Sequence, residues 1–346
     1  MARIYELSTE QEAVVKDLTK AFQSAHIMFM LGSGASCPAV PLAGNIEAEI
    51  DAHTAAGRLD DATALLYDLL HALQTATNDI VGPLAIPACA QTLAQYQALL
   101  RTIERVLGAR HSTILPRQAT VFTTNYDVFL DVAAAACESA LLANGFGASA
   151  SPDGSVEYSP KHFFRATYDT GDLYEYKVEL PSVNLVKLHG CASWLRDGDR
   201  LLRRRTHCHL PGPGADIVAM RTFVERFAIV MPQSTKFNTT VLNRTYYDLL
   251  RLYANVLERE NVLLVSFGFS FRDEHILHLT KRALRNPTLR LVVPAYDRAG
   301  AASLAGMFAA HSNVLVVAAP DGEVIDFTRF NALLTEAVPA HAGVGR

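Results

Sequence analysis

The sequence lacks three features that would place a protein in a special class: long apolar runs, paired cysteines and a large excess of one charge. Its longest apolar run near the amino terminus, residues 27–31, is far shorter than the roughly 20 residues that span a bilayer. The five cysteines are widely spaced and form no CxxC pair, so neither a disulfide framework nor a zinc ribbon is expected. A net charge of −4 gives no general attraction to nucleic acid. We therefore expect a cytoplasmic protein with no bound metal, no membrane segment and no direct nucleic-acid binding.

What is present is enough apolar sequence for a large core. The chain has 346 residues, of which 50% are hydrophobic and 19% are charged. By length this corresponds to about two domains, or to one α/β domain with insertions. Short buried-strand patterns alternate with longer helical patterns, and such alternation implies parallel strands joined by right-handed crossovers. We predict a single α/β domain over residues 1–346, with a Rossmann-like, doubly wound parallel sheet.

The predicted elements are spread over the whole chain. Strands are expected at residues 26–31, 119–123, 183–188, 227–231, 262–267, 289–293 and 314–317. Helices are expected from about residue 8, and at about 44–53, 128–142, 240–259, 273–284, 299–310 and 324–337. The alanine- and leucine-rich residues 57–110 are predicted to form a helical insertion, and residues 145–182 and 196–214 to form loop-rich excursions.

A glycine-rich turn follows the first of these strands directly. It consists of Gly32, Ser33, Gly34, Ala35 and Ser36. Glycines allow backbone N–H groups to approach a phosphate closely, and the helix that follows would direct its positive end towards it. A tight turn with no ligand explains the same residues equally well. The turn is not a Walker A loop, because no Gly-Lys-Ser/Thr sequence follows it.

Two polar motifs follow other predicted strands. Thr124, Asn125 and Asp127 lie where a strand meets a helix, which is where open parallel sheets bind ligands. Helix capping is the alternative role for Asn and Asp at such a position. His189 leaves a buried strand and enters a glycine turn, where a general base would face a ligand. The alternative for a lone histidine is a purely structural role.

The last motif, at residues 266–274, again combines a strand, a glycine turn and a helix. Gly268 and Ser270 are candidates for holding a ribose or a phosphate. Asp273 lies near the start of the helix, where it is expected to interact with the positive end of the helix dipole and not to act in catalysis.

In their order and nature the four motifs resemble those of the sirtuin-like NAD-consuming family. The glycine turn is similar to the family's Gly-Ala-Gly-x-Ser loop, and residues 123–127 are similar to its Thr-Gln-Asn-Ile-Asp segment. His189 with Gly190 matches the family's His-Gly pair, in which the histidine is the catalytic base. Gly268 and Ser270 match its Gly-Thr-Ser turn, which touches the cofactor.

This resemblance implies a role for each motif. His189 would be the base, Asn125 would position water or ribose, and Asp127 would orient or stabilise them electrostatically. The turn at residues 32–36 would seat the pyrophosphate, Thr124 would belong to the nicotinamide-ribose pocket, and the turn at residues 268–270 would contact the adenosine side.

The sequence also departs from the deacylating sirtuins. Val40 and Pro41 are followed by Leu42, Ala43 and Gly44, so the Phe and Arg of the family's Ile-Pro-Asp-Phe-Arg stretch are absent. The four-cysteine zinc module of those enzymes is also missing. What remains resembles a prokaryotic branch that hydrolyses NAD outright, often in anti-phage defence and frequently with a partner such as a HerA-type ATPase. The resemblance thus implies an NAD+ hydrolase that releases nicotinamide and ADP-ribose, working as a homo-oligomer.

Three other functions remain open at this point. An NAD-dependent lysine deacylase would share the pocket. A dinucleotide oxidoreductase would leave the motifs at Asn125 and His189 unexplained. A non-catalytic scaffold subunit that senses a nucleotide would use the helical insertion as a contact surface. The basic residues at 196–205 are more simply explained as a solvated loop than as a nucleic-acid site, since no aromatic residues are interleaved with them.

Overall fold

A computed structural model describes residues 2–110, 114–135, 141–147, 155–170, 177–197, 200–203, 211, 214–229 and 241–339. Within these residues the main feature is an eight-stranded sheet in which every neighbouring pair is parallel. Its spatial order is β1 (Arg3–Glu6), β14 (Val314–Ala318), β13 (Arg290–Pro294), β12 (Val262–Phe267), β2 (His26–Leu31), β3 (Gln118–Thr123), β8 (Ser182–Lys187) and β4 (Leu141–Ala143). All residues of β8 and β12 are buried, as expected for central strands covered on both faces.

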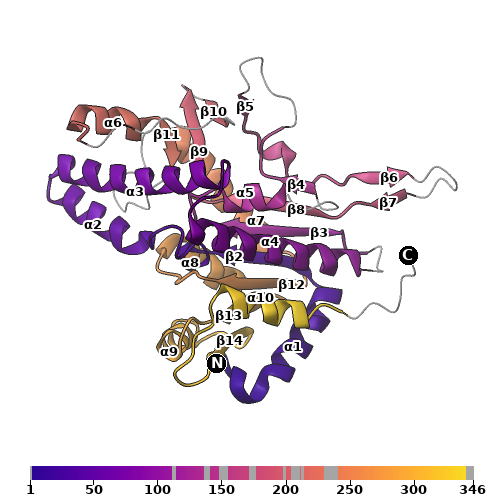
Figure 1. Ribbon diagram of the computed structural model, residues 1–346. Helices are drawn as coiled ribbons and strands as arrows, with labels where there is room; N and C mark the ends of the chain where they lie inside the picture. Colours follow the sequence, from indigo (N-terminus) through magenta and orange to yellow (C-terminus); the bar gives the residue numbers. More distant parts are fainter. Residues whose placement is uncertain are drawn as a thin grey trace.

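Helices cover both faces of this sheet (Figure 1). One face carries α1 (Leu7–Ser24), α4 (Pro87–Gly108), α5 (Phe129–Ala134) and α10 (Phe327–Glu336); the other carries α7 (Val241–Leu257) and α8 (Glu274–Ala283). Ring contacts assign the faces: Phe267 of β12 stacks on Phe330 of α10 at 4.3 Å, whereas Phe122 of β3 meets Tyr253 of α7 at 4.9 Å. The predicted α/β class with a Rossmann-like parallel sheet is confirmed.

The order of the strands creates a switch point between β2 and β12. From β2 the chain continues to β3 and β8 on one side, then crosses over to β12, β13 and β14 on the other side. All six residues of β2 pair in register with β12, from His26 with Val262 to Leu31 with Phe267. In doubly wound sheets, ligands bind at the carboxyl ends of the strands at such a point.

A second, antiparallel sheet lies beyond β8. It contains β11 (Phe227–Ile229), β9 (Gly190–Asp197), β10 (Arg200–Arg203) and β5 (Val156–Glu157). Residues 196–197 and 200–203, where the sequence predicted a loop, thus belong to a hairpin, while Arg204 and Arg205 lie outside the described residues. A two-stranded hairpin of β6 (Tyr168–Thr170) and β7 (Lys177–Glu179) projects from the body of the molecule (Figure 1).

The remaining helices include the region predicted as a helical insertion. Residues 57–110 contain α3 (Leu59–Ile80) and α4, preceded by α2 (Ala43–Ala55), while α6 (Ile217–Glu225) and α9 (Arg298–Met307) lie further along the chain. The helix expected at 128–142 is wrong in its length: α5 ends at Ala134, and Leu141–Ala143 form the edge strand β4. Among the described residues, no helix combines the length and apolarity that crossing a bilayer requires.

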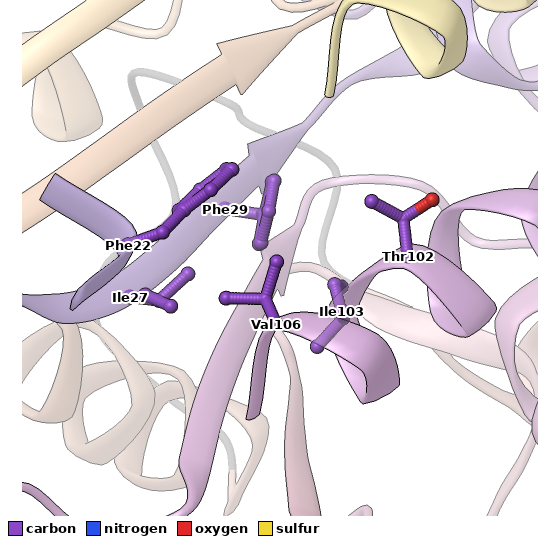
Figure 2. Close-up of a pocket in the computed structure, with 6 residues that line it drawn as sticks. All are labelled: Phe22, Ile27, Phe29, Thr102, Ile103 and Val106. Carbon is purple, nitrogen blue, oxygen red and sulfur yellow. The ribbon is translucent and has the colours of Figure 1, made fainter. Parts of the chain in front are cut away.

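A small gap in the apolar core lies under α1 and α4 (Figure 2). It has no room for a water molecule. The side chains around it are Phe22, Ile27, Phe29, Thr102, Ile103 and Val106. Ile27 is near the amino end of β2, so this gap belongs to the packing of helices on the sheet and lies away from the carboxyl edge.

Candidate functional site

The glycine turns after β2 and β12 meet at the switch point through their backbones. The Gly32 N–H donates to the carbonyl of Phe267 at 3.1 Å, and the Gly34 N–H donates to the carbonyl of Gly268 at 3.0 Å. These two bonds extend the pairing of β2 with β12 past the last register pair. The first and fourth sequence motifs are therefore in direct contact.

Side chains are excluded from this contact. A Cβ atom on Gly32 would lie 2.4 Å from the carbonyl oxygen of Gly268, and one on Gly34 would lie 2.8 Å from its Cα. Gly268 also has a φ of +64°, in the left-handed region that favours glycine. The close approach of two backbones is thus sufficient to explain why glycine occupies these three positions.

The backbone N–H groups of the first turn are largely used inside the protein. Besides Gly32 and Gly34, the N–H of Ala35 donates to Gly32 and that of Ser36 donates to Ser33, which forms the short 3₁₀ turn Ser33–Ala35. The next α-helix begins only at Ala43, so its positive end does not follow this turn directly. A phosphate seat at residues 32–36 remains a prediction, and it would depend on the partly exposed Ser33 and Gly34.

Asn125 joins the turn after β2 to the end of β3. Its side-chain Nδ2 lies 2.9 Å from the carbonyl oxygen of Gly32, 2.9 Å from Ser36 Oγ and 3.2 Å from the hydroxyl of Tyr96. A carbonyl oxygen can only accept, so the amide nitrogen must face Gly32. Asn125 Oδ1 therefore points away from Gly32. It is buried and has no hydrogen-bond partner among the described residues.

Asp127 is held in the same network. Its Oδ2 accepts from Ser36 Oγ at 2.6 Å and its Oδ1 accepts from the N–H of Phe129 at 3.2 Å. Burial raises the pKa of the Asp127 carboxyl, although the Lys187 ammonium and the Ser36 hydroxyl act in the opposite direction. Asp127 thus fixes the position of the Ser36 hydroxyl.

Lys187 supports this segment from the neighbouring strand. Its ammonium is buried, donates to the backbone carbonyl of Asp127 and lies 3.2 Å from Asp131 Oδ2. Burial opposes its charge, but Cys191, Asp131 and Asp127 together raise the pKa of Lys187. The ammonium therefore stays protonated and ties β8 to the loop that carries Asn125.

His189 forms a buried pair with Asp273. Its Nε2 lies 3.0 Å from Asp273 Oδ2, and the two side chains are 3% and 7% exposed. Burial raises the pKa of the Asp273 carboxyl, but His189 and the N–H of Ile276 lower it by more, so it falls below its ordinary value of 3.8. An ionised carboxylate can only accept, so Nε2 carries the proton and Nδ1 has the acceptor role in a neutral ring.

The strand register brings the Asn125 and His189 segments to one edge of the sheet. Thr123 pairs with Lys187, and the N–H of Leu188 donates to the carbonyl of Thr123 at 2.8 Å. Asn125 and His189 thus each follow a paired strand end by two residues. The ring of Tyr126, which follows Asn125 in the chain, has its centroid 6.2 Å from that of the His189 ring.

A comparison with family models settles the family. Residues 119–305 match the model of the SIR2-like domain, which is more than half of the chain. The chain belongs to the SIR2-like family. This membership relates the protein to NAD chemistry. In a search of curated proteins, none matches the chain.

The SIR2-like match covers part of the site described above. It begins in β3 and ends in α9, so it includes Asn125, His189 and Gly268, whereas the turn at residues 32–36 lies before it. Of the remaining predicted residues, Thr124 is partly exposed and donates its N–H to the carbonyl of Leu31 at 3.3 Å, and Ser270 is exposed. Among the described residues, no group of three or more His, Cys, Asp and Glu side chains has the arrangement of a metal site.

Sequence reasoning did not identify three polar residues of this SIR2-like site. Tyr96 lies on α4 among leucines at helical spacing, where a tyrosine reads as ordinary core. Lys187 lies in the strand predicted at residues 183–188, where no role in the site was expected for it. Asp273 was predicted to serve the start of a helix; it does cap α8, since its Oδ1 accepts from the N–H of Ile276 at 3.0 Å, but its other oxygen faces His189. Of the three, only Lys187 gave a signal in the sequence, because a lysine ends an apolar strand pattern two residues before a histidine.

Proposed function

We propose that this SIR2-like protein is an NAD glycohydrolase, which cleaves the bond between nicotinamide and ribose to give nicotinamide and ADP-ribose. Its family relates it to NAD, and its site combines a histidine–carboxylate pair with a buried asparagine at the switch point of the sheet. The absence from the sequence of the Phe and Arg found in deacylating sirtuins favours water over an acyl-lysine as the acceptor.

The observation that carries this proposal is the orientation of the Asn125 side chain. Its nitrogen is engaged by Gly32 and Ser36, which leaves Oδ1 buried with no partner among the described residues. An unpaired buried acceptor costs about 1–3 kcal/mol unless a donor reaches it. The hydroxyl of a ribose or a water molecule is such a donor, so Oδ1 is suited to hold either one.

This reaction requires the protein to orient the substrate and to supply one general base. The nicotinamide of NAD+ is a cationic leaving group, so no general acid is needed. As the bond between ribose C1′ and the ring nitrogen breaks, its electron pair returns to the ring and releases neutral nicotinamide. Water adds to the oxocarbenium-like carbon and gives up a proton, which His189 accepts and passes to solvent. Asp273 keeps the imidazole oriented, because its Oδ2 accepts from Nε2 and leaves Nδ1 to act as the base.

Single substitutions in the two motifs test this assignment. Purified Asn125→Ala and His189→Ala are expected to lose nicotinamide release from NAD by about 100-fold or more, the scale of a lost general base. The assay contains NAD and no acyl-lysine peptide, because a deacylase would then release little nicotinamide. Asn184→Ala is the matched control: Asn184 is equally buried in β8 but lies away from the carboxyl edge, so its turnover should persist. Full turnover in either site variant would refute the assignment.

We further propose that NAD depletion is the biological effect, within a bacterial anti-phage defence system. The resemblance to the NAD-hydrolysing prokaryotic branch supports this setting. An unregulated enzyme of this kind would exhaust its host's own NAD, so we expect a homo-oligomer under the control of a partner such as a HerA-type ATPase. Repeating the assay with the product of a neighbouring gene, and measuring mass in solution, tests both points. If no condition releases nicotinamide, the alternative of a non-catalytic, nucleotide-sensing scaffold subunit is favoured.

A further inference from the structure

Tyr96 brings a hydroxyl to the site from a helix that the SIR2-like match does not include. It lies on α4 and its side chain is fully buried. Its ring stacks on Phe129 of α5 at 5.7 Å and meets Phe327 of α10 edge-on at 5.1 Å. Because these two contacts come from two different helices, the ring has little freedom to move. The position of the hydroxyl is therefore set by the core.

The hydroxyl lies within hydrogen-bond distance of both Ser36 and the Asn125 amide. It is 2.7 Å from Ser36 Oγ and 3.2 Å from Asn125 Nδ2. Burial and the nearby Asp127 carboxyl raise the pKa of Tyr96 well above its usual value, although Ser36 and Asn125 oppose this, so the hydroxyl keeps its proton.

The direction of each hydrogen bond in this network can be assigned from the donors available. Ser36 has one proton and donates it to Asp127 Oδ2. Tyr96 must therefore be the donor in its contact with Ser36 Oγ. Ser36 Oγ accepts this bond and the one from Asn125 Nδ2, which uses both of its lone pairs. The Asn125 nitrogen is thus engaged by Gly32 and Ser36, and Oδ1 is directed out of the network.

We infer that Tyr96 is a positioning residue, whose hydroxyl holds Ser36 and the Asn125 amide in the orientation that presents Oδ1 to the substrate. The expected effect of Tyr96 on turnover rests on the proposed function. The expected effect of Tyr96 on the Asn125 amide does not depend on that function. Tyr96 acts through its neighbours and does not itself touch the reacting atoms. Because Tyr96 lies on α4, this role makes a helix that precedes the SIR2-like match at residues 119–305 part of the proposed active site.

The variant Tyr96→Phe removes the hydroxyl and keeps the ring contacts. Loss of one neutral hydrogen bond corresponds to about a 2- to 10-fold effect, so we expect kcat for nicotinamide release to fall about 5-fold. The KM for NAD should stay within about twofold, because the hydroxyl contributes to orientation and not to binding. A loss of folded protein would also lower the apparent kcat at an unchanged KM, so the result must be compared with a control variant of similar stability.

Tyr253→Phe is the matched control. Tyr253 is also fully buried, and its hydroxyl bonds to Thr280 Oγ1 at 2.7 Å on the other face of the sheet. Both variants lose one buried tyrosine hydroxyl, so their melting temperatures should fall by similar amounts. Only Tyr96→Phe should lower kcat. Equal kcat values in the two variants would overturn the inference.

A double-mutant cycle shows whether Tyr96 acts through Ser36. Ser36→Ala removes the atom that receives the Tyr96 hydrogen bond. The double variant with Tyr96→Phe should then be no more than about twofold slower than Ser36→Ala alone. If the reductions in kcat of the two single variants multiplied in the double variant, the two residues would act independently, which would contradict the inference.

A readout that needs no turnover separates this inference from the proposed function. The side-chain amide protons of Asn125 give an NMR signal that is identified by its absence in Asn125→Ala. In Tyr96→Phe this signal should shift and its protons should exchange faster with solvent, whereas Tyr253→Phe should leave it unchanged. This result would support the positioning role even for a protein that releases no nicotinamide. An unchanged Asn125 signal in Tyr96→Phe would overturn the role even in an active enzyme.

Discussion

Asp273 serves two parts of the molecule with one carboxylate. One oxygen caps α8 through the N–H of Ile276, and the other pairs with His189. Asparagine caps a helix about as well as aspartate does, so Asp273→Asn removes the charge that faces His189 and keeps the cap. We expect a loss of about 1.5–3 kcal/mol in unfolding free energy at pH 7, the scale of a hydrogen bond to a charged group, together with slower nicotinamide release.

The dependence of this loss on pH follows from the direction of the pKa shift. The pKa of Asp273 is lower in the folded protein than its ordinary value of 3.8. Its contribution to stability is therefore complete above about pH 4 and disappears as the pH falls through the folded pKa. Urea unfolding of both proteins at a series of pH values measures this. Asp326→Asn, at a cap of α10 that accepts from the N–H of Arg329 and is not paired with a histidine among the described residues, should cost about 0.5 kcal/mol or less. A pH-independent difference for Asp273→Asn would contradict the assignment.

At the scale of elements, the contact between the two glycine turns is the feature most sensitive to substitution. Gly32→Ala would place a Cβ 2.4 Å from the carbonyl oxygen of Gly268, which is a backbone atom already held by a hydrogen bond from the Gly34 N–H. We expect a loss of about 1–3 kcal/mol or more, because neither turn can move without breaking its pairing. Gly306→Ala in α9 meets nothing within 4 Å and should stabilise the protein by about 0.5–1 kcal/mol. Thermal unfolding compares the two, and an unchanged melting temperature for Gly32→Ala would contradict the prediction.

The elements also show which parts of the fold the sequence could predict. The strands β2, β3, β8 and β12 were predicted because each is a short apolar run next to a turn. The hairpin of β9 and β10 was missed, since arginines interrupt its apolar pattern, and a helix was extended past Ala134 because the following alanines favour helix. Strand β1 was not expected at all, because two of its four residues are charged and it obtains its structure from pairing with β14.

The candidate site was predictable only in part. Asn125, Asp127 and His189 stood out as polar residues at strand ends, which local sequence reveals. The pairing of His189 with Asp273 and the bond from Tyr96 to Ser36 join residues 84 and 60 positions apart, and only the tertiary fold brings them together. The glycines of both turns were read as a place for phosphate, whereas their contact with each other depends on the neighbouring positions of β2 and β12 in the sheet.

On the scale of the whole molecule, stability should differ sharply between the central sheet and the projecting hairpin. Residues of β2 and β12 are buried by helices on both sides, whereas every residue of β6 and most of β7 are exposed (Figure 1). In hydrogen exchange followed by mass spectrometry, the amides of β6 and β7 should exchange through local opening, and those of β2 and β12 only through global unfolding. Slow exchange of the hairpin would contradict this. If that protection increased with protein concentration, it would identify the hairpin as the surface covered by a second copy.

The pairing of β1 with β14 has a consequence for how the protein is made. Arg3 pairs with Leu315, so the partner of the first strand leaves the ribosome about 310 residues later. At usual rates of synthesis this takes roughly 15–60 seconds, during which β1 has nothing to pair with. The outer edge of the sheet is thus completed last, after the strands that carry Asn125 and His189 have been released.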